Sequence, residues 1–329
     1  MSKLTKLFLV ACFCVAFLGG CKKEESKQVI IYTNADEEAQ LAMQKVLDKN
    51  GFKGQYILQT YGTNELGGKL LGEGIDIEAD LITMSSYYID SAQEENDMFV
   101  DLDIDKQTID DVPTYRTPLL AIEGTIIVNT TELEKAGLER PTSLKDLAKP
   151  EYKDNISIVD MAGSSTGWLL VQALIEEYGE KEAEKILTAM MENAGPHLES
   201  SGSGPLKKVR AGEVAIGFGL RHQAVADKAD GLPIDYIDPE EGNFTLTESI
   251  AVVKRSEKKT KLAKAMAKCI IEDGRDDIME NYPMPLYEGE EVESGSISGN
   301  EKTFSQPLTI ELLQEHLDLS EKCRMKAWE

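Results

Sequence analysis

Cysteine and histidine, which supply many catalytic nucleophiles, bases and metal ligands, are scarce in this sequence. The 329 residues include five Cys and three His. There is no HExxH motif, no GxSxG motif and no cysteine cluster with the spacing of a zinc site. The stretch from Gly62 to Leu70, GTNELGGKL, lacks the Gly-Lys spacing and the following Ser or Thr of a P-loop. We therefore predict neither an enzyme nor a resident metal or cofactor.

Basic residues are also few. Lys and Arg total 35 against 59 Asp and Glu, which gives a formal net charge of -24. A chain of this charge repels the phosphates of nucleic acid and of anionic lipid headgroups, so nucleic acid is excluded as a partner. A small anionic ligand is not excluded, because local dipoles and hydrogen-bond donors decide that contact.

A single long apolar run, residues 7–18, stands near the start of the chain. It is too short for an ordinary membrane-spanning helix, two lysines precede it, and Leu18-Gly19-Gly20-Cys21 follows. This stretch resembles a bacterial lipoprotein signal peptide. The resemblance implies that residues 1–20 are removed, that Cys21 is lipidated and that residues 21–27 form a polar tether. We expect an extracytoplasmic protein of the cell envelope, anchored to the membrane through that lipid.

Strand patterns alternate with amphipathic helix patterns over the rest of the chain, which favours an α/β architecture with mostly parallel pairing. Polar residues follow several of the expected strands. The carboxyl ends of parallel strands meet at one edge of a sheet, where ligands bind. We therefore expect one shared cleft, lined by Thr33, Asn34, Thr63, Ser85, Ser86, and residues within 163–166 and 217–222.

Three segments in series carry a family resemblance: PTSLKDLAKPEYKDNISIVDMAGSSTGWLLVQAL, SSGSGPLKKVRAGEVAIGFGLRHQAV and TESIAVVKRSEKKTKLAKAMAKCII. They resemble the type II periplasmic-binding-protein superfamily, most closely the branch that serves ABC importers of ferric iron, 2-aminoethylphosphonate and sugar phosphates. The resemblance implies two Rossmann-like lobes with mixed, mostly parallel sheets, joined by a two-segment hinge. Lobe 1 would comprise residues 28–124 and 250–329, and lobe 2 residues 125–249.

The same resemblance implies a partner, a cognate ABC permease, and we expect the protein to be a monomer. Iron-binding members of the branch carry an adjacent tyrosine pair after the segment that reads GEVAIG here. That place reads Gly219-Leu220-Arg221-His222-Gln223, without tyrosine. A guanidinium cannot ligate a cation. Tyr87-Tyr88 does form a pair but matches a different place, and we interpret it as core or as an aromatic wall of the cleft.

Two hydroxyl-rich stretches just ahead of expected helices predict an anion site. Ser164, Ser165 and Thr166 precede one helix, and Ser201 and Ser203 precede another that begins near Pro205. Hydroxyls and first-turn amides at a helix start suit phosphoryl oxygens, although each stretch alone is also an ordinary cap.

The remaining predicted site residues are charged or titratable. Arg221 would supply a planar donor fork to a phosphate or phosphonate, and His222 a further donor. Glu248, near the second crossing between lobes, would need an ammonium or several hydroxyls from the ligand. Glu123 could play the same part or form a salt bridge at the hinge.

The sequence thus predicts an ABC-importer receptor that captures a small anionic or zwitterionic solute, such as an aminoalkylphosphonate or a sugar phosphate. The alternatives are a ferric-iron receptor with another ligand set, and an envelope lipoprotein with a hydrolase or adhesion role. Cys269 and Cys323 could pair or remain buried thiols.

Overall fold

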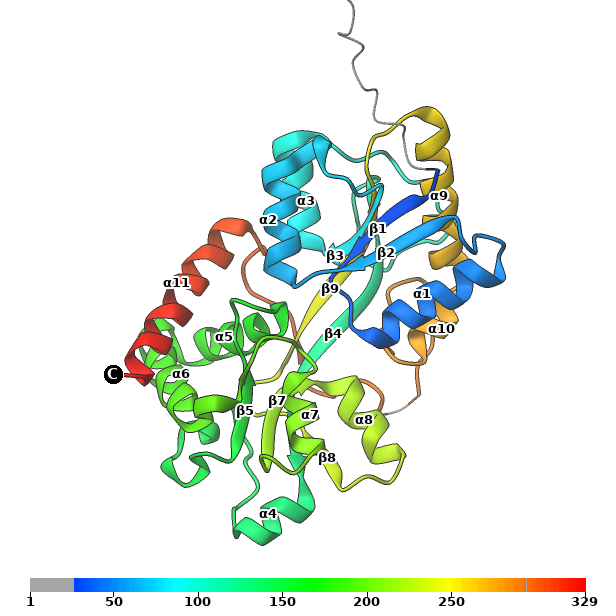
Figure 1. The fold of residues 1–329 in the computed structure, drawn as a ribbon. Coiled ribbons are helices and arrows are strands. Elements are labelled where there is room, and N and C mark those ends of the chain that lie inside the picture. The colour runs from blue at the N-terminus through cyan, green and yellow to red at the C-terminus, as the bar shows by residue number, and fades with distance from the viewer. Residues whose placement is uncertain (1–26, 294) are drawn as a thin grey trace, which may run out of the picture.

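The computed structural model describes residues 27–293 and 295–329, arranged as two halves linked by long strands (Figure 1). The predicted signal peptide, Cys21 and nearly all of the tether lie outside the described residues. The first half contains β1 (Val29–Thr33), α1 (Glu37–Lys49), β2 (Tyr56–Thr60), α2 (Thr63–Glu73), β3 (Leu81–Ser85), α3 (Ser86–Asn96), α9 (Glu257–Glu272) and α10 (Arg275–Met279). The second half contains α4 (Thr130–Ala136), β5 (Ile156–Val159), α5 (Ser165–Tyr178), α6 (Glu180–Ala194), β6 (Leu198–Glu199), α7 (Gly204–Arg210), β7 (Ile216–Leu220), α8 (Arg221–Ala229) and β8 (Ile234–Ile237). The linking strands are β4 (Arg116–Asn129) and β9 (Asn243–Val252), and the chain closes with β10 (Glu301–Lys302) and α11 (Ile310–Ala327).

The strands form one mixed sheet in the order β2-β1-β3-β9-β4-β7-β5-β6. Parallel pairing joins β1 to β2 and β3, and β5 to β6 and β7. Helices between these strands bury apolar faces, as in α1, where the buried positions Ala39, Met43, Val46 and Leu47 recur at helical spacing. The α/β class predicted from the alternation is confirmed.

Two long antiparallel strands run from one half into the other. The start of β4 pairs with β9, up to Glu123 opposite Thr245, while its end, from Gly124 on, pairs with β7 and β8. The far end of β9 pairs with β3, where Glu248 lies opposite Ser85. The predicted lobe boundaries, between residues 124 and 125 and between residues 249 and 250, fall within these two strands.

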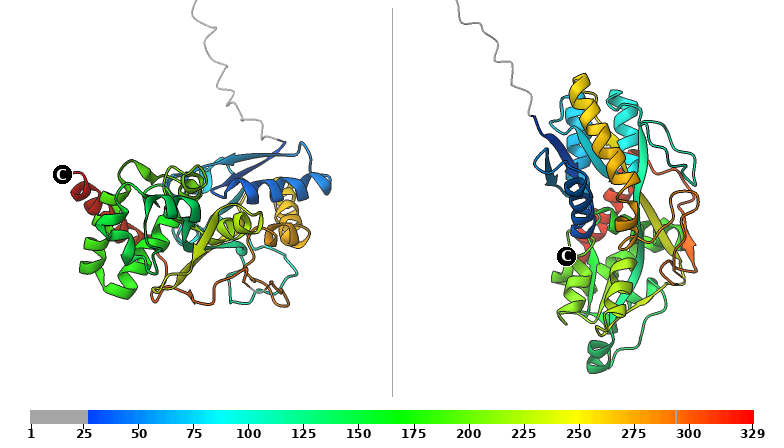
Figure 2. Two further views of the ribbon diagram at one scale, coloured as in Figure 1. Left: turned by 90° about the horizontal axis from the view of Figure 1, so that it is seen from below. Right: turned by 90° about the vertical axis from the view of Figure 1, so that its right-hand side faces the viewer.

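The last helix does not lie where the predicted lobe boundary would put it. Residues 250–329 were expected in lobe 1, but α11 packs along α6 and touches α5, both in the second half (Figure 2). Trp168 of α5 contributes to this docking, since its indole Nε1 donates a 2.8 Å hydrogen bond to Nδ1 of the buried His316. The indole also packs against the ring of Phe304. The described chain therefore passes a third time between the halves, after α10 and before α11.

Tyr87 and Tyr88 are buried in the core, with ring centroids 4.8 Å apart. Tyr87 meets Trp168 edge to face across the two halves. Cys269 and Cys323 are buried free thiols. Among the described residues, no helix has the length and apolar character needed to span a membrane.

A buried ion pair fixes the chain just after α10. The Arg275 guanidinium is 1 % exposed, donates to both carboxylate oxygens of Glu290, and also donates to the carbonyls of Leu119 and Met284. Glu290 in turn accepts from the amides of Leu286 and Tyr287. This network holds the loop that begins with Tyr282, a residue of the cavity described below.

Arg275→Met should lower the free energy of unfolding by about 3–5 kcal/mol, because it leaves the Glu290 carboxylate buried without its partner. Urea denaturation measures the change. Lys69→Met, which breaks the solvent-accessible pair with Glu73 on α2, should change it little. Equal effects of the two variants would contradict this role for Arg275.

Candidate functional site: a cavity between the two halves

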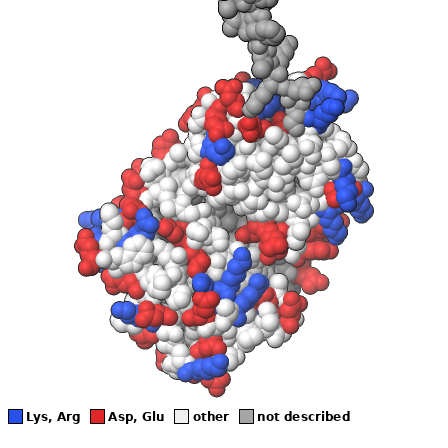
Figure 3. All heavy atoms as spheres, viewed as in Figure 1, with Lys and Arg blue, Asp and Glu red and all other residues white. Residues whose placement is uncertain are grey.

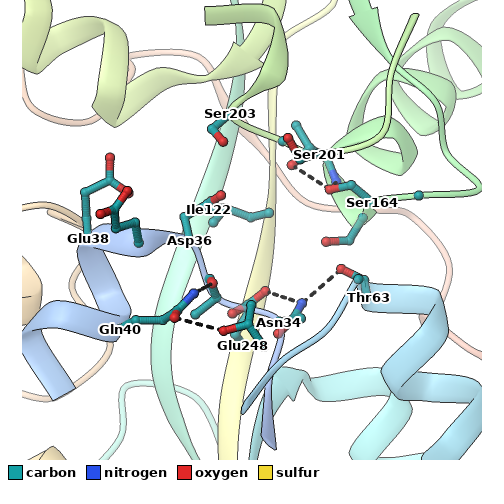
Figure 4. A pocket seen from close by; sticks show the side chains of 18 of the residues that line it. Asn34, Asp36, Glu38, Gln40, Thr63, Ile122, Ser164, Ser201, Ser203 and Glu248 are labelled. Carbon is teal, nitrogen blue, oxygen red and sulfur yellow. Dashed lines mark hydrogen bonds between the residues drawn. The ribbon is translucent and has the colours of Figure 1, made fainter. Parts of the chain in front are cut away.

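A cavity of about 550 Å³ lies between the two halves, and Figure 4 shows it from close by. The first half contributes the turns ahead of α1 and α2. The second half contributes the turns ahead of α5 and α7. The predicted site residues that line it are Asn34, Thr63, Ser164, Ser165, Thr166, Ser201, Ser203 and Glu248. The structure thus brings these eight residues together around one cavity, and their role in binding a solute stays a prediction.

The two hydroxyl-rich turns touch each other because glycines stand at the contact points. A Cβ on Gly163 would come within 2.5 Å of the Ser200 carbonyl oxygen, and one on Gly202 within 2.3 Å of Thr166 Oγ1. Ser164 caps α5, its hydroxyl accepting from the Thr166 amide at 3.3 Å. Ser203 makes no such cap bond to α7, which begins at Gly204, next to the predicted Pro205. The hydroxyls of Ser201 and Ser203 lie on the same side of the cavity as Ser164 (Figure 4).

Asn34, Thr63 and Glu248 form the opposite wall. The Asn34 side-chain amide donates to Thr63 Oγ1 at 3.0 Å and to Glu248 Oε1 at 2.9 Å. Glu248 is 4 % exposed, and its other oxygen, Oε2, has no hydrogen-bond partner among the described residues. Burial raises the pKa of Glu248 to about 7, the bond from Asn34 opposes this, and the nearby Asp36 adds to it. The wall thus holds a carboxyl group with one unused acceptor.

Carboxylates outnumber cations around the cavity. The acidic lining residues are Asp36, Glu37, Glu38, Glu65 and Glu248, and the basic ones are Lys207 and Arg210. Arg210 is also paired with Asp227. Figure 3 shows basic side chains gathered over α7, below acidic side chains over the start of α1.

The charges of the two halves meet across the cavity at Asp36. Burial raises the pKa of Asp36 to about 6 and Glu38 adds to it, while Lys207 and Ser203 of the second half oppose the rise. The excess of carboxylates disfavours a purely anionic solute in the cavity unless a cation binds with it.

Arg221 does not line the cavity, contrary to the sequence prediction. Its guanidinium donates to both carboxylate oxygens of Asp238 and to the carbonyls of Gly295 and Ser296, and it stacks over the Tyr236 ring at 4.5 Å. Its side chain is 3 % exposed. The sequence does not reveal this pairing, because Arg221 opens α8 while its partners come from β8, the residue after β8 and the loop after α10.

Four other predicted residues support the wall instead of lining it. His222 packs against Tyr282 with ring centroids 4.3 Å apart and the rings tilted by 43°, and burial lowers the pKa of the imidazole to about 3, so it is neutral. Thr33 is fully buried and accepts from the Ala35 amide. Ser85 is also fully buried. Ser86 bonds to the Thr247 carbonyl and the Ser249 hydroxyl.

Glu123, expected either in the cleft or in a hinge salt bridge, lies in β4 with Oε2 at 3.8 Å from Arg221 Nε. Burial raises its pKa to about 6, whereas Ser298 and Arg221 act in the opposite direction. Of the two expected arrangements, the structure has the salt bridge between Glu123 and Arg221, and Glu123 does not line the cavity.

Several lining residues were missed by the sequence analysis. Asp36 and Glu38 stand at the start of α1, where the helix dipole is already a sufficient reason for acidic residues. Lys207, Gln223 and Tyr282 carry no local signal of a site. Gln223 donates to Glu38 Oε1 at 3.2 Å across the two halves.

Comparison with known proteins gives the family. The family model described as bacterial extracellular solute-binding protein matches residues 79–300, about two thirds of the chain. The chain belongs to this family. The resemblance drawn from the sequence is confirmed, and family members of this kind bind solutes outside the cytoplasm.

Individual relatives of this solute-binding protein are distant. It is 23 % identical over 283 residues to the spermidine/putrescine-binding periplasmic protein of Salmonella typhimurium, covering 77 % of each chain. An uncharacterized Haemophilus influenzae protein is 30 % identical over 128 residues, 39 % of this chain and 37 % of that one.

A solved structure extends the likeness to the whole fold. The periplasmic binding protein AfuA of Actinobacillus pleuropneumoniae, with exogenous fructose-6-phosphate bound, has a TM-score of 0.68 to this chain at 18 % identity. The match covers 91 % of this chain and 97 % of AfuA. At this level of identity the likeness shows the fold, and the predicted type II binding-protein architecture is confirmed.

Gly163→Ala should lower the free energy of unfolding by about 1–3 kcal/mol, because the new methyl group meets the backbone of Ser200. Gly68→Ala is the matched control, since its Cβ would find nothing within 4 Å inside α2, where Ala is favoured by roughly 0.5–1 kcal/mol. Urea denaturation of both variants measures the difference. Two variants of equal stability would show that the turns do not need this close approach.

Proposed function

We propose that this protein is the solute receptor of an ABC importer and that its solute is a small zwitterion, a phosphonate or phosphate ester that carries an amine, of the 2-aminoethylphosphonate kind. A cognate permease would receive it from the closed protein. The observation that carries the proposal is the buried Glu248 carboxyl, whose free oxygen lies across the cavity from two turns rich in hydroxyl groups.

The phosphoryl end of such a solute fits the second half. The hydroxyls of Ser201 and Ser203 and the start of α5 behind Ser164 offer hydrogen-bond donors from two directions. The positive end of the α5 dipole favours an anion there. Lys207, at the rim of the same half, adds a positive charge.

The amine end fits the first half. An ammonium group placed beside Glu248 Oε2 would satisfy that oxygen and compensate its buried charge. Asp36 and Glu38 strengthen the preference for a cationic group. An aminoalkylphosphonate supplies this group, whereas a sugar phosphate supplies hydroxyls only. Because Arg221 does not line the cavity, a purely anionic solute has less support.

A diamine is the second candidate, favoured by the excess of carboxylates around the cavity and by the distant relative named for spermidine and putrescine. The ferric alternative lacks support. No group of three or more His, Cys, Asp or Glu suited to a metal occurs in residues 27–293 and 295–329, and Tyr87-Tyr88 lies in the core. A hydrolase or adhesion role has no feature in its favour.

Isothermal titration with 2-aminoethylphosphonate, ethylphosphonate, fructose 6-phosphate and putrescine tests the proposal. Glu248→Gln should weaken 2-aminoethylphosphonate by tenfold or more, because the ammonium loses a buried ionic partner, and should not weaken ethylphosphonate. Glu65→Gln, a carboxylate at the exposed rim of the same cavity, is the control and should change either affinity less than threefold. Tight putrescine binding without phosphonate binding would establish the second candidate instead.

The affinity for 2-aminoethylphosphonate should rise with pH. Glu248 must be ionised to pair with the ammonium, and its raised pKa of about 7 means that below neutral pH the ligand has to displace a proton. The loss should approach tenfold per unit below pH 7 and vanish above pH 8. The protonation of the phosphonate group itself affects binding to the wild type and to Glu248→Gln in the same way. The difference between the two plots of affinity against pH therefore reports on Glu248 alone. If the affinities of the two proteins changed with pH in parallel, displacement of a proton from Glu248 by the ligand would be ruled out.

A further inference from the structure

We propose that Asn64 is a positioning residue for solute binding: it latches the first half onto the turn that carries Ser164 without touching the solute. Its side-chain Nδ2 donates to the carbonyls of both Met161 and Ala162, each at 3.0 Å. These carbonyls belong to the second half and directly precede the hydroxyl-rich turn. Asn64 itself does not line the cavity.

The Asn64 amide is held in place from its own half. Its Oδ1 accepts a 2.9 Å hydrogen bond from the Tyr88 hydroxyl, which leaves both amide hydrogens directed at the other half. The Tyr88 ring lies so close to α2 that a Cβ on Gly67 would come within 2.2 Å of it. Gly67 is therefore the residue that lets Tyr88 reach Asn64, and this accounts for part of the Gly-rich stretch from 62 to 70.

The receiving turn is equally fixed. Met161 is 1 % exposed, and a Cβ on Gly167 of α5 would meet its Cα at 2.6 Å. The Ala162 and Gly163 amides both donate to Asp160, to its side chain and its carbonyl respectively. A Cβ on Gly62 would stand 3.4 Å from the Gly163 carbonyl, so the two backbones are in direct contact here. A latch between two rigid partners stabilises only the closed arrangement.

The latch differs from the hydrogen bond that Gln223 makes across the cavity. Gln223 donates to Glu38, but both line the cavity, so a change in either alters the solute's surroundings. Removal of the Asn64 amide leaves the cavity wall intact. The expected kinetic signature is faster solute dissociation with an unchanged association rate, because opening must precede release.

Stopped-flow binding of 2-aminoethylphosphonate tests the inference. Asn64→Ala should raise the dissociation rate about tenfold, as expected for the loss of two hydrogen bonds. Asn64→Asp should raise it further, because a carboxylate would face two carbonyls, although it keeps the Tyr88 bond. Tyr88→Phe should give a smaller rise. The matched control is Asn50→Asp, whose amide donates within its own helix to Val46 and which should behave as wild type.

Equal dissociation rates for Asn64→Asp and Asn50→Asp would overturn the latch, as would a change confined to association. The inference uses the solute-binding function of the family and does not depend on which solute is bound. If no compound of the panel binds wild type, the proposed ligand class fails, and small-angle X-ray scattering of the free proteins then decides the latch. A larger radius of gyration for Asn64→Asp than for wild type supports the latch, and equal radii of gyration for these two proteins overturn it.

Discussion

The antiparallel pairing of β4 with β9 is the constraint on which the site depends. The two strands share a ladder from Arg116 to Glu123 and then diverge, one toward β7 and β8 and the other toward β3. Each half of the molecule is built on one end of this pair. Because Glu248 lies in β9 opposite Ser85, strand register fixes its carboxyl group in the cavity wall, and the residue cannot leave this position without loss of sheet hydrogen bonds.

Much of the fold follows from local pattern. The alternation of strand and helix patterns predicts the α/β class, and the hydroxyl-rich stretch 164–166 lies at the start of α5 as expected. The position of α11 does not follow, because it depends on contacts between distant residues, among them the bond between Trp168 and His316 and the ion pairs of Lys322 and Lys326 with Glu184 of α6. Contacts between residues 148 positions apart leave no periodic signal in one sequence.

The site shows the same division. Hydroxyl-rich helix starts are visible in the sequence, since the cap itself needs those residue types. The role of a long charged side chain is not visible, because it depends on which acid lies within reach after folding. With 59 Asp and Glu in the chain, an arginine has many candidate partners, and Arg221 pairs with Asp238. The same abundance of acids explains why Asp36 and Glu38, ordinary for a helix start, become part of a cavity wall.

The third passage of the chain between the halves has a practical consequence. An odd number of passages leaves the two ends of the described chain on opposite bodies, Val29 in the first half and α11 in the second (Figure 1). Two fluorophores, one attached near each end, would therefore report on different halves of the molecule. Their separation would follow the relative rotation of those bodies, and neither label would occupy the cavity.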